Sequence, residues 1–214
     1  MKTYQQEFLQ FAIDTGVLRF GSFTLKSGRT SPYFYNVGLF NDGQSLARLG
    51  RYYAQTLLDN MSGEYMLFGP AYKGIPLVAA SAIALAEHQS VNVAYSFNRK
   101  EAKDHGEGGE LVGAPLTGRV VIIDDVITAG LSVGQSVDII RSAGAKPAAV
   151  VIALDRQEKI VNGDKSAVAE VEERYGIPVY AIATMNTLIE FLSGKANYAD
   201  QLQSMQNYRN QYGA

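Results

Sequence analysis

Two adjacent aspartates in the middle of the chain are the residues whose type and spacing point most directly to chemistry. Asp124 and Asp125 follow a run of four β-branched apolar residues, and a short Thr-Ala-Gly segment (128–130) then leads into a helical pattern. The apolar run predicts a buried strand, and ligands of open α/β sheets bind outside the carboxyl ends of strands. The start of a helix offers free backbone N–H groups and the positive end of the dipole, which suit a phosphate. The glycine permits close approach of the backbone, and the hydroxyls of Thr128 and Ser132 can add donors.

The two carboxylates would repel a phosphate, so we expect them to face a different group. Ribose hydroxyls are good candidates, because one carboxylate can accept two such hydrogen bonds. Residues 120–132 therefore predict a site for a phosphorylated ribose. The alternative is structural, namely a strand that ends in two exposed acids which cap the following helix.

A second set of charged residues lies between positions 98 and 118, in a stretch that is first charged and then rich in glycine. Three cations and a histidine within seven residues suit a polyanion such as pyrophosphate, and the glycines provide a flexible hinge. Unstructured segments of this length are often lids, so we expect a mobile lid at about 98–118, with a solvated charged loop as the alternative. The basic residues are Arg99, Lys100, Lys103 and His105, and the glycines are Gly106, Gly108 and Gly109.

Two further segments and one arginine complete the candidates. The loop GPAYKGIP (69–76) places Tyr72 and Lys73 between a predicted strand and a predicted helix, where an ordinary connection is the alternative. The segment LKSGRTSPYFYN (25–36) combines a lysine with adjacent aromatic residues. A flat anionic ring needs an apolar slot and a cation for its carboxylate, whereas the structural alternative is a hairpin with a core phenylalanine and a solvated lysine. Arg156 ends a predicted strand, a place where a single arginine usually lies on the surface.

The elements that must position these residues follow from the hydrophobic pattern. Near-continuous apolar strands alternate with helices from residue 65 onward, which predicts an α/β fold with a parallel sheet covered on both faces. Residues 19–38 predict two or three short strands or turns, and Asp42 is the expected N-cap of a helix. The spacing of Thr187 and Glu190 is that of a capping box, which predicts the start of a short helix. The expected strands span 65–70, 91–97, 119–126, 147–156 and 177–184, and the expected helices span 1–16, 43–60, 74–89, 130–145 and 167–176, followed by a helical tail.

The overall composition limits the class of protein. With 214 residues, 47% of them hydrophobic, the chain is long enough for one domain with a sizeable core. A net charge of −2 gives no global attraction to nucleic acid or to an anionic membrane, and we expect neither as a partner. The N-terminus lacks the apolar core of a signal peptide, and no apolar run approaches the roughly 20 residues of a membrane helix. The chain also contains no cysteine. We therefore expect a cytoplasmic protein. A Rossmann oxidoreductase is disfavoured, since no G-x-G-x-x-G motif follows a strand.

Two of these segments resemble motifs of a known family. Residues 120–132 resemble the motif with which type I phosphoribosyltransferases bind the activated ribose phosphate PRPP, and residues 25–36 resemble the N-terminal signature of orotate phosphoribosyltransferases. The resemblance implies the type I phosphoribosyltransferase fold, a mainly parallel sheet flanked by helices, with a small N-terminal hood of strands and helix (about 1–40) and the lid (about 98–118) in one domain, 1–214. It implies transfer of the 5-phosphoribosyl group from PRPP to orotate, which yields orotidine 5′-monophosphate (OMP) and pyrophosphate in the de novo synthesis of UMP.

The same resemblance implies a cofactor and an assembly. Mg²⁺ is expected to be held mainly by the substrate, with no direct protein ligand. Members of the family are typically homodimers in which the lid serves the neighbour's active site. Two alternatives share the fold, namely a purine-type phosphoribosyltransferase and a non-catalytic PRPP-binding regulator. Residues 25–36 argue against the first, and the basic lid argues against the second.

The resemblance also implies roles for individual residues. The implied catalytic residues are Lys103, His105, Asp124 and Asp125, and His105 is the one that offers a proton. The implied PRPP-binding residues are Lys26, Tyr72, Lys73, Arg99, Lys100, Lys103, His105, Asp124, Asp125, Val126, Ile127, Thr128, Ala129, Gly130, Leu131 and Ser132. The implied orotate-binding residues are Lys26, Phe34, Tyr35, Thr128 and Arg156.

Overall fold

The centre of the protein is a six-stranded sheet in the order β5-β4-β3-β6-β7-β8. The computed structural model describes residues 1–25, 27–103 and 109–214, without the side chains of residues 101–103. All neighbouring strands are parallel except β4 and β5, which confirms the expected mainly parallel α/β sheet. The strands are β3 (Met66–Gly69), β4 (Tyr95–Lys103), β5 (Gly109–Gly113), β6 (Arg119–Asp124), β7 (Lys146–Asp155) and β8 (Val179–Thr184).

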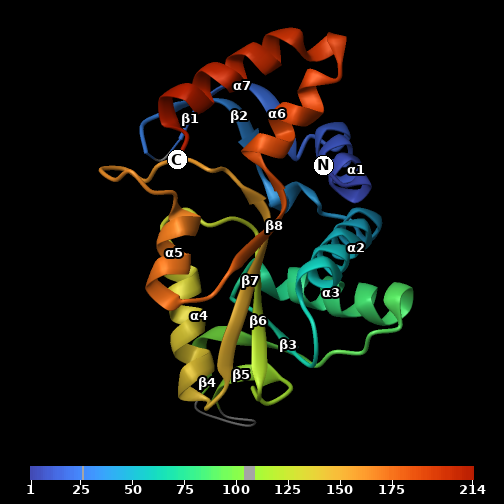
Figure 1. Cartoon of the computed structure of the whole chain (residues 1–214). Coiled ribbons are helices and arrows are strands. Elements are labelled where there is room, and N and C mark those ends of the chain that lie inside the picture. Colours follow the sequence, from blue (N-terminus) through green and yellow to red (C-terminus); the bar gives the residue numbers. More distant parts are fainter. Residues whose placement is uncertain (26, 104–108) are drawn as a thin grey trace.

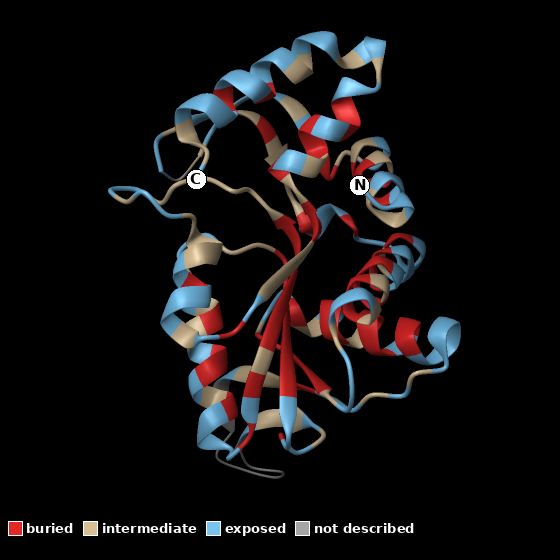
Figure 2. Ribbon diagram, in the orientation of Figure 1, coloured by how far each residue is buried: buried red, intermediate tan, exposed pale blue. Residues whose placement is uncertain are grey.

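Helices cover both faces of this sheet (Figure 1). Helices α2 (Gly43–Asn60) and α3 (Gly74–Gln89) lie on one face, and α4 (Leu131–Ser142) and α5 (Ala167–Tyr175) lie on the other. Side chains of a strand point alternately to opposite faces, so β6 contributes Val121 and Ile123 to one core, and Val120 and Ile122 to the other. Figure 2 shows β6 and β7 buried along most of their length, which explains why their apolar runs are almost uninterrupted.

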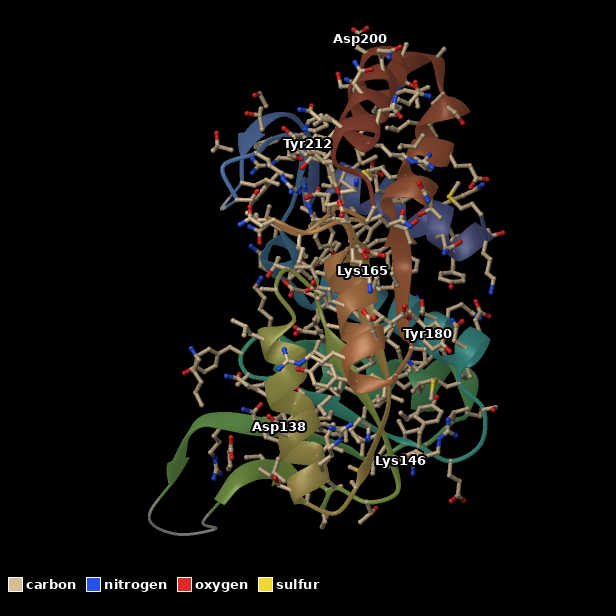
Figure 3. The ribbon with its side chains drawn as sticks, turned by 60° about the vertical axis from the view of Figure 1, so that its left-hand side comes forward. Asp138, Lys146, Lys165, Tyr180, Asp200 and Tyr212 are labelled. Atoms are coloured by element: carbon tan, nitrogen blue, oxygen red, sulfur yellow. The ribbon has the colours of Figure 1, made fainter. Side chains whose placement is uncertain are left out.

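A smaller layer, the hood, lies above the carboxyl edge of the sheet and contains segments from both ends of the chain (Figure 1). The expected hood of about residues 1–40 accounts for the N-terminal part of this layer, and segments from the C-terminal part of the chain cover its two-stranded hairpin. The ring of Tyr33 stands edge-on to Tyr208 at 6.4 Å, and Tyr212 lies beside the hairpin (Figure 3). The hood consists of α1 (Thr3–Asp14), β1 (Leu18–Thr24), β2 (Thr30–Tyr35), η1 (Val37–Leu39), α6 (Met185–Ser193), η2 (Ala196–Tyr198) and α7 (Ala199–Tyr212).

The segment 98–118 differs from the expected unstructured stretch. Strand β4 begins at Tyr95 rather than at residue 91, and it continues to Lys103. It pairs antiparallel with β5, with Phe97 opposite Val112 and Asn98 opposite Leu111, so that the ladder replaces much of the expected loop. Residues 104–108, which include His105, lie outside the described part of the chain, and the mobility of the lid stays a prediction.

Two helix starts were expected from capping residues, and one was misplaced. Asp42 caps α2 as expected, since its carboxylate accepts hydrogen bonds from the N–H groups of Gln44 and Ser45, both at 2.9 Å. Helix α6 begins a turn earlier than expected, because Thr184 rather than Thr187 is its N-cap. Thr184 ends β8 in an extended conformation, and its hydroxyl accepts the N–H of Thr187 at 3.2 Å.

None of the helices in the described ranges combines the length and the apolar character that a bilayer span requires.

Candidate active site

The candidate residues gather at the carboxyl edge of the sheet, between β3 and β6. From β3 the chain passes through α3 to β4 on one side, and from β6 it passes through α4 to β7 on the other. The direction of winding therefore reverses between these two strands. A crevice opens at such a switch point, and ligands of open α/β sheets bind there.

Asp124 and Asp125 end β6 at this point and are both buried, each with 7% of its surface exposed. The hydroxyl of Ser132 donates to Asp124 Oδ2 at 2.8 Å, and the N–H of Asp125 donates to Asp124 Oδ1 at 2.9 Å. From α2, the Tyr53 hydroxyl donates to the main-chain oxygen of Asp124 at 2.8 Å. Helix α4 has Gly130 at its N-cap and no side-chain cap, so the alternative of two exposed capping acids is wrong.

Burial also changes the acidity of the pair. The pKa of Asp124 is raised to about 6, mainly by loss of solvation and next by the neighbouring carboxylate of Asp125, while the hydrogen bond from Ser132 opposes the shift. Lys73 Nζ lies 2.6 Å from Asp125 Oδ2, with 60% of the lysine side chain exposed. The site therefore holds two acids and one cation that still reaches solvent.

The loop between β3 and α3 brings Lys73 to the acids through a tight turn. A Cβ atom at Gly69 would overlap the main chain of Gly74, and one at Gly74 would lie 2.9 Å from the carbonyl oxygen of Ile123. Only glycine leaves this space free. The loop also contacts the lid strand, because the N–H of Ala71 donates to Asn98 Oδ1 at 2.9 Å.

Two predicted PRPP residues meet above this loop. The ammonium of Lys100, on β4, lies 4.9 Å from the centre of the Tyr72 ring, and 67% of Tyr72 is exposed. Arg99 and Lys103 belong to the same strand, although the side chain of Lys103 is not described. The described geometry thus places Tyr72 and Lys73 on the β3–α3 loop and Lys100 on β4, which contacts this loop.

The segment after Asp125 forms the turn that was expected to cradle a phosphate. Gly130 has a φ of +67°, and it precedes the first turn of α4, whose N–H groups have no acceptor within the helix. Thr128, Ala129 and Leu131 are exposed around the turn, whereas Val126 and Ile127 pack against the two cores. The Ser132 hydroxyl donates to Asp124 Oδ2, and a contact of this residue with a phosphate stays a prediction.

The two aromatic residues expected to line one slot point to opposite sides of β2. The Phe34 ring stacks on Phe23 at 5.5 Å, while Tyr35 lies 6.5 Å from Phe8 in the core. The hydroxyl of Tyr35 is buried and has no hydrogen-bond partner in the described residues. Burial first, and the nearby negative charge of Asp125 next, hold the pKa of Tyr35 well above its usual value. Lys26 lies outside the described residues.

Arg156 is not a surface residue at the end of β7. Its guanidinium lies 4.2 Å from the centre of the Tyr33 ring, donates to Ser31 Oγ at 3.1 Å and forms an ion pair with Glu158 at 2.6 Å. Its side chain is only 16% exposed, so the structure joins the end of β7 to β2 of the hood.

Four supporting residues were missed by the sequence analysis, or were seen only as core. Tyr53 is a buried aromatic residue of α2, and an apolar pattern gives no signal for its hydroxyl bond to Asp124. Asn98, Ser31 and Glu158 act across long sequence separations, and only a three-dimensional contact identifies them.

Comparison with known proteins agrees with this geometry. Residues 37–179 match the family model described as the phosphoribosyl transferase domain. Proteins named orotate phosphoribosyltransferase from Thioalkalivibrio sulfidiphilus and Cronobacter sakazakii are 62% and 56% identical to this chain, and in both comparisons 100% of each chain is covered. The crystal structure of orotate phosphoribosyltransferase from Francisella tularensis superposes with a TM-score of 0.89 at 42% identity, covering 97% of this chain and 100% of that one.

Proposed function

The chain belongs to the orotate phosphoribosyltransferase family, and on that premise we propose that it transfers the 5-phosphoribosyl group from PRPP to orotate, with OMP and pyrophosphate as products, in pyrimidine biosynthesis. The observation that carries the proposal is the buried Asp124–Asp125 pair at the switch point, directly before the open turn of α4 and 2.6 Å from Lys73. Neither a purine-type enzyme nor a non-catalytic regulator finds support among these relatives. We place the reaction in the cytoplasm, since a chain without cysteine suits a reducing compartment.

The first task of the site is to hold the ribose. Asp124 and Asp125 accept hydrogen bonds from the ribose hydroxyls, and the exposed turn at 128–130 binds the 5′-phosphate through its N–H groups. The hydrogen bonds from Ser132 and Tyr53 fix Asp124 before the substrate arrives, so little orientation is lost on binding.

The second task is to stabilise the leaving pyrophosphate. The bond from ribose C1 to a pyrophosphate oxygen breaks with its electron pair on that oxygen, while N1 of orotate attacks C1 from the opposite face. Lys73 and the lid cations Arg99, Lys100 and Lys103 neutralise the charge that develops on the pyrophosphate, and His105 offers a proton. Closure of the lid excludes water, which would otherwise hydrolyse PRPP.

The third task is to hold orotate. We assign its binding to Lys26, Phe34, Tyr35, Thr128 and Arg156. The support is the nearby charge of Asp125 at Tyr35 and the burial of the Arg156 guanidinium beside the hood. An arginine that is fixed by packing can meet a planar carboxylate with two parallel N–H bonds.

The donor set fits Mg²⁺ that arrives on the substrate. The described residues contain no group of three histidine, cysteine or acidic side chains able to hold a metal, and Asp125 already pairs with Lys73. Asp124 and Asp125 are the acidic side chains that would face such a cation, which would be held mainly by the substrate. The bound cation supplies positive charge to the leaving group.

We also propose a homodimer whose lid reaches the neighbouring site. The support is the surface of α3, which packs beside β4 and carries Ile83 with 57% of its surface exposed. Tyr95 at the start of β4 is 38% exposed, and Tyr72 before α3 is 67% exposed. Exposed large apolar side chains on α3, just before it and at the start of β4 fit a contact with a second copy.

The direct test is an assay with PRPP and Mg²⁺ and with orotate, adenine, guanine or hypoxanthine in separate reactions. We expect nucleotide and pyrophosphate to form in equal amounts with orotate alone, as measured by chromatography. Conversion of a purine without conversion of orotate would refute the orotate assignment and leave the fold unchanged. Binding of PRPP without turnover of any base would favour a regulator.

A further inference from the structure

The guanidinium of Arg156 is held in place by three groups that come from different parts of the chain. Glu158 forms the ion pair at 2.6 Å, Ser31 accepts a hydrogen bond at 3.1 Å, and the Tyr33 ring lies against the guanidinium at 4.2 Å. The side chains of Arg156 and Glu158 are only 16% and 13% exposed. In such surroundings the orientation of a guanidinium depends strongly on its partner carboxylate, because water does not screen the charge.

Glu158 belongs to a short segment, residues 157–160, which we call the strap. From the hood, Arg29 Nη1 donates to the carbonyl of Lys159 at 2.6 Å. From the end of α7, the carbonyl of Tyr212 accepts the N–H of Lys159 at 2.9 Å, and the N–H of Ala214 donates to the carbonyl of Gln157 at 3.0 Å. These hydrogen bonds, which we call the C-terminal clamp, hold the strap between the β1–β2 hairpin and residues 212–214, and Figure 3 shows Tyr212 beside the hairpin.

The contacts leave one side of the guanidinium available. Both the ion pair with Glu158 and the hydrogen bond to Ser31 are made by Nη2. Among the described residues Nη1 and Nε of Arg156 make no hydrogen bond that meets the usual geometry, although the Tyr208 hydroxyl lies near the guanidinium. These two donors form the edge that binds a carboxylate or a ring carbonyl side-on.

We propose that Glu158 is a positioning residue for the nucleobase site: held by the C-terminal clamp, it orients Arg156 so that its free edge faces the anionic pyrimidine. Residues 212–214 thereby contribute to the specificity for the nucleobase, although they lie far along the chain from Asp124 and Asp125. This inference rests on the proposed function, because it assigns Arg156 to orotate.

The test compares Glu158→Gln with a matched control, Glu173→Gln. Glu173 also pairs with a cation at 2.6 Å, but the pair is exposed and lies on α5. We expect Glu158→Gln to raise KM for orotate at least about ten-fold while KM for PRPP stays within about two-fold, because one charge-assisted contact orients Arg156. Glu173→Gln should change neither constant. An unchanged KM for orotate in Glu158→Gln would overturn the proposal. A lower KM would also overturn it, because it would show that Glu158 competes with the substrate for Arg156.

A double-mutant cycle separates positioning from general stability. If Glu158 acts only through Arg156, Glu158→Gln should have no further effect on KM for orotate when it is added to Arg156→Ala. Additive effects would overturn the proposal.

A chain that lacks residues 213–214 retains Glu158 but loses part of the clamp, so it provides a second test if Glu158→Gln does not fold. We expect a smaller rise in KM for orotate in that chain, and an unchanged value would refute the role of the clamp.

An assay of the wild-type protein separates a failure of the proposed function from a failure of the positioning role of Glu158. If it forms no OMP from orotate and PRPP, the proposed function fails. If it forms OMP and the Glu158 variants leave KM for orotate unchanged, only the positioning role fails.

Discussion

Ser132 and Asp124 form a pair in which one residue sets the acidity of the other. The serine hydroxyl donates to Asp124 Oδ2 at 2.8 Å and limits the rise that burial causes in the pKa of Asp124, which stands at about 6. Ionised Asp124 is the form that accepts two hydrogen bonds from ribose, so kcat/KM for PRPP should fall as the pH decreases through about 6.

Removal of the serine hydroxyl should therefore move the acid limb of the pH profile. We expect Ser132→Ala to shift the limb to higher pH, because the ionised form of Asp124 loses a donor. The measurement is kcat/KM for PRPP between about pH 5 and pH 8. The ionisations of PRPP itself cancel in the comparison with wild type. Ser136→Ala is a suitable control, since the Ser136 hydroxyl on the same helix donates to a main-chain oxygen. Superimposable profiles for Ser132→Ala and wild type would contradict the pairing.

The raised pKa of Asp124 also predicts the direction of a stability effect. The folded-state pKa of about 6 exceeds the ordinary 3.8, so the native state binds the proton more tightly than the unfolded state does. Stability from this group is fully present below about pH 4 and is lost as the pH rises through about 6. Asp124→Asn should therefore raise the free energy of unfolding at pH 7.5 by up to about 3 kcal/mol, less the value of any hydrogen bond that the amide fails to keep. Urea titrations at about pH 4 and pH 7.5 test this, and a variant less stable than wild type at the higher pH would contradict it.

At the scale of elements, the contact between α2 and α3 determines where the Lys73 loop lies. Gly50 on α2 meets the main chain of Ala80 on α3, and a Cβ atom at Gly50 would lie 2.5 Å from the carbonyl oxygen of Ala80. Alanine in place of glycine normally stabilises a helix, but here two backbones would have to separate. The helix pair therefore depends on the absence of one side chain.

Gly50→Ala should consequently destabilise the protein by about 1 to 3 kcal/mol, the usual cost of overpacking. Gly43→Ala is the matched control in the same helix, because a Cβ atom there would meet nothing within 4 Å. We expect the control to be neutral or slightly stabilising. Equilibrium unfolding in urea measures both variants, and equal stabilities would show that α2 and α3 move apart without cost.

At the scale of the whole molecule, the proposed dimer can be tested by complementation. Lys103→Ala damages the lid, and Asp125→Asn damages the ribose site; we expect each to lower activity by a factor of ten or more. If the lid acts across the interface, one site of every hybrid dimer has both parts intact. An equal mixture should then recover about a quarter of wild-type activity, since half of the dimers are hybrids with one working site each.

The complementation has its own controls. Subunit exchange is measured independently with differently tagged chains, and absence of recovery despite exchange would mean that each lid closes over its own subunit. Ile83→Asp places a charge on the exposed face of α3, and it should prevent both dimer formation and recovery if this face is the interface. Dimers that persist in this variant would place the interface elsewhere.

The sequence by itself determined the features that depend on short stretches of chain. Alternating apolar segments predicted the parallel sheet, Asp42 predicted the start of α2, and the order of strand, acids, glycine turn and helix predicted the position of Asp124 and Asp125 at the carboxyl end of β6. Such patterns are local, because strand alternation, capping and turn geometry involve residues that are neighbours in sequence. The opposite directions of Phe34 and Tyr35 follow from the same alternation, and they could have been predicted.

Only the tertiary structure decided which distant groups meet. It showed that α6 and α7 complete the hood, that β4 continues into the lid because Phe97 pairs with Val112, and that Glu158 holds Arg156 against Tyr33. It also turned the Ser132 hydroxyl toward Asp124 and set the Tyr53 hydroxyl beneath the acids. These contacts depend on the closure of long loops and on the packing of layers, and the spacing of residues along the chain contains no measure of either.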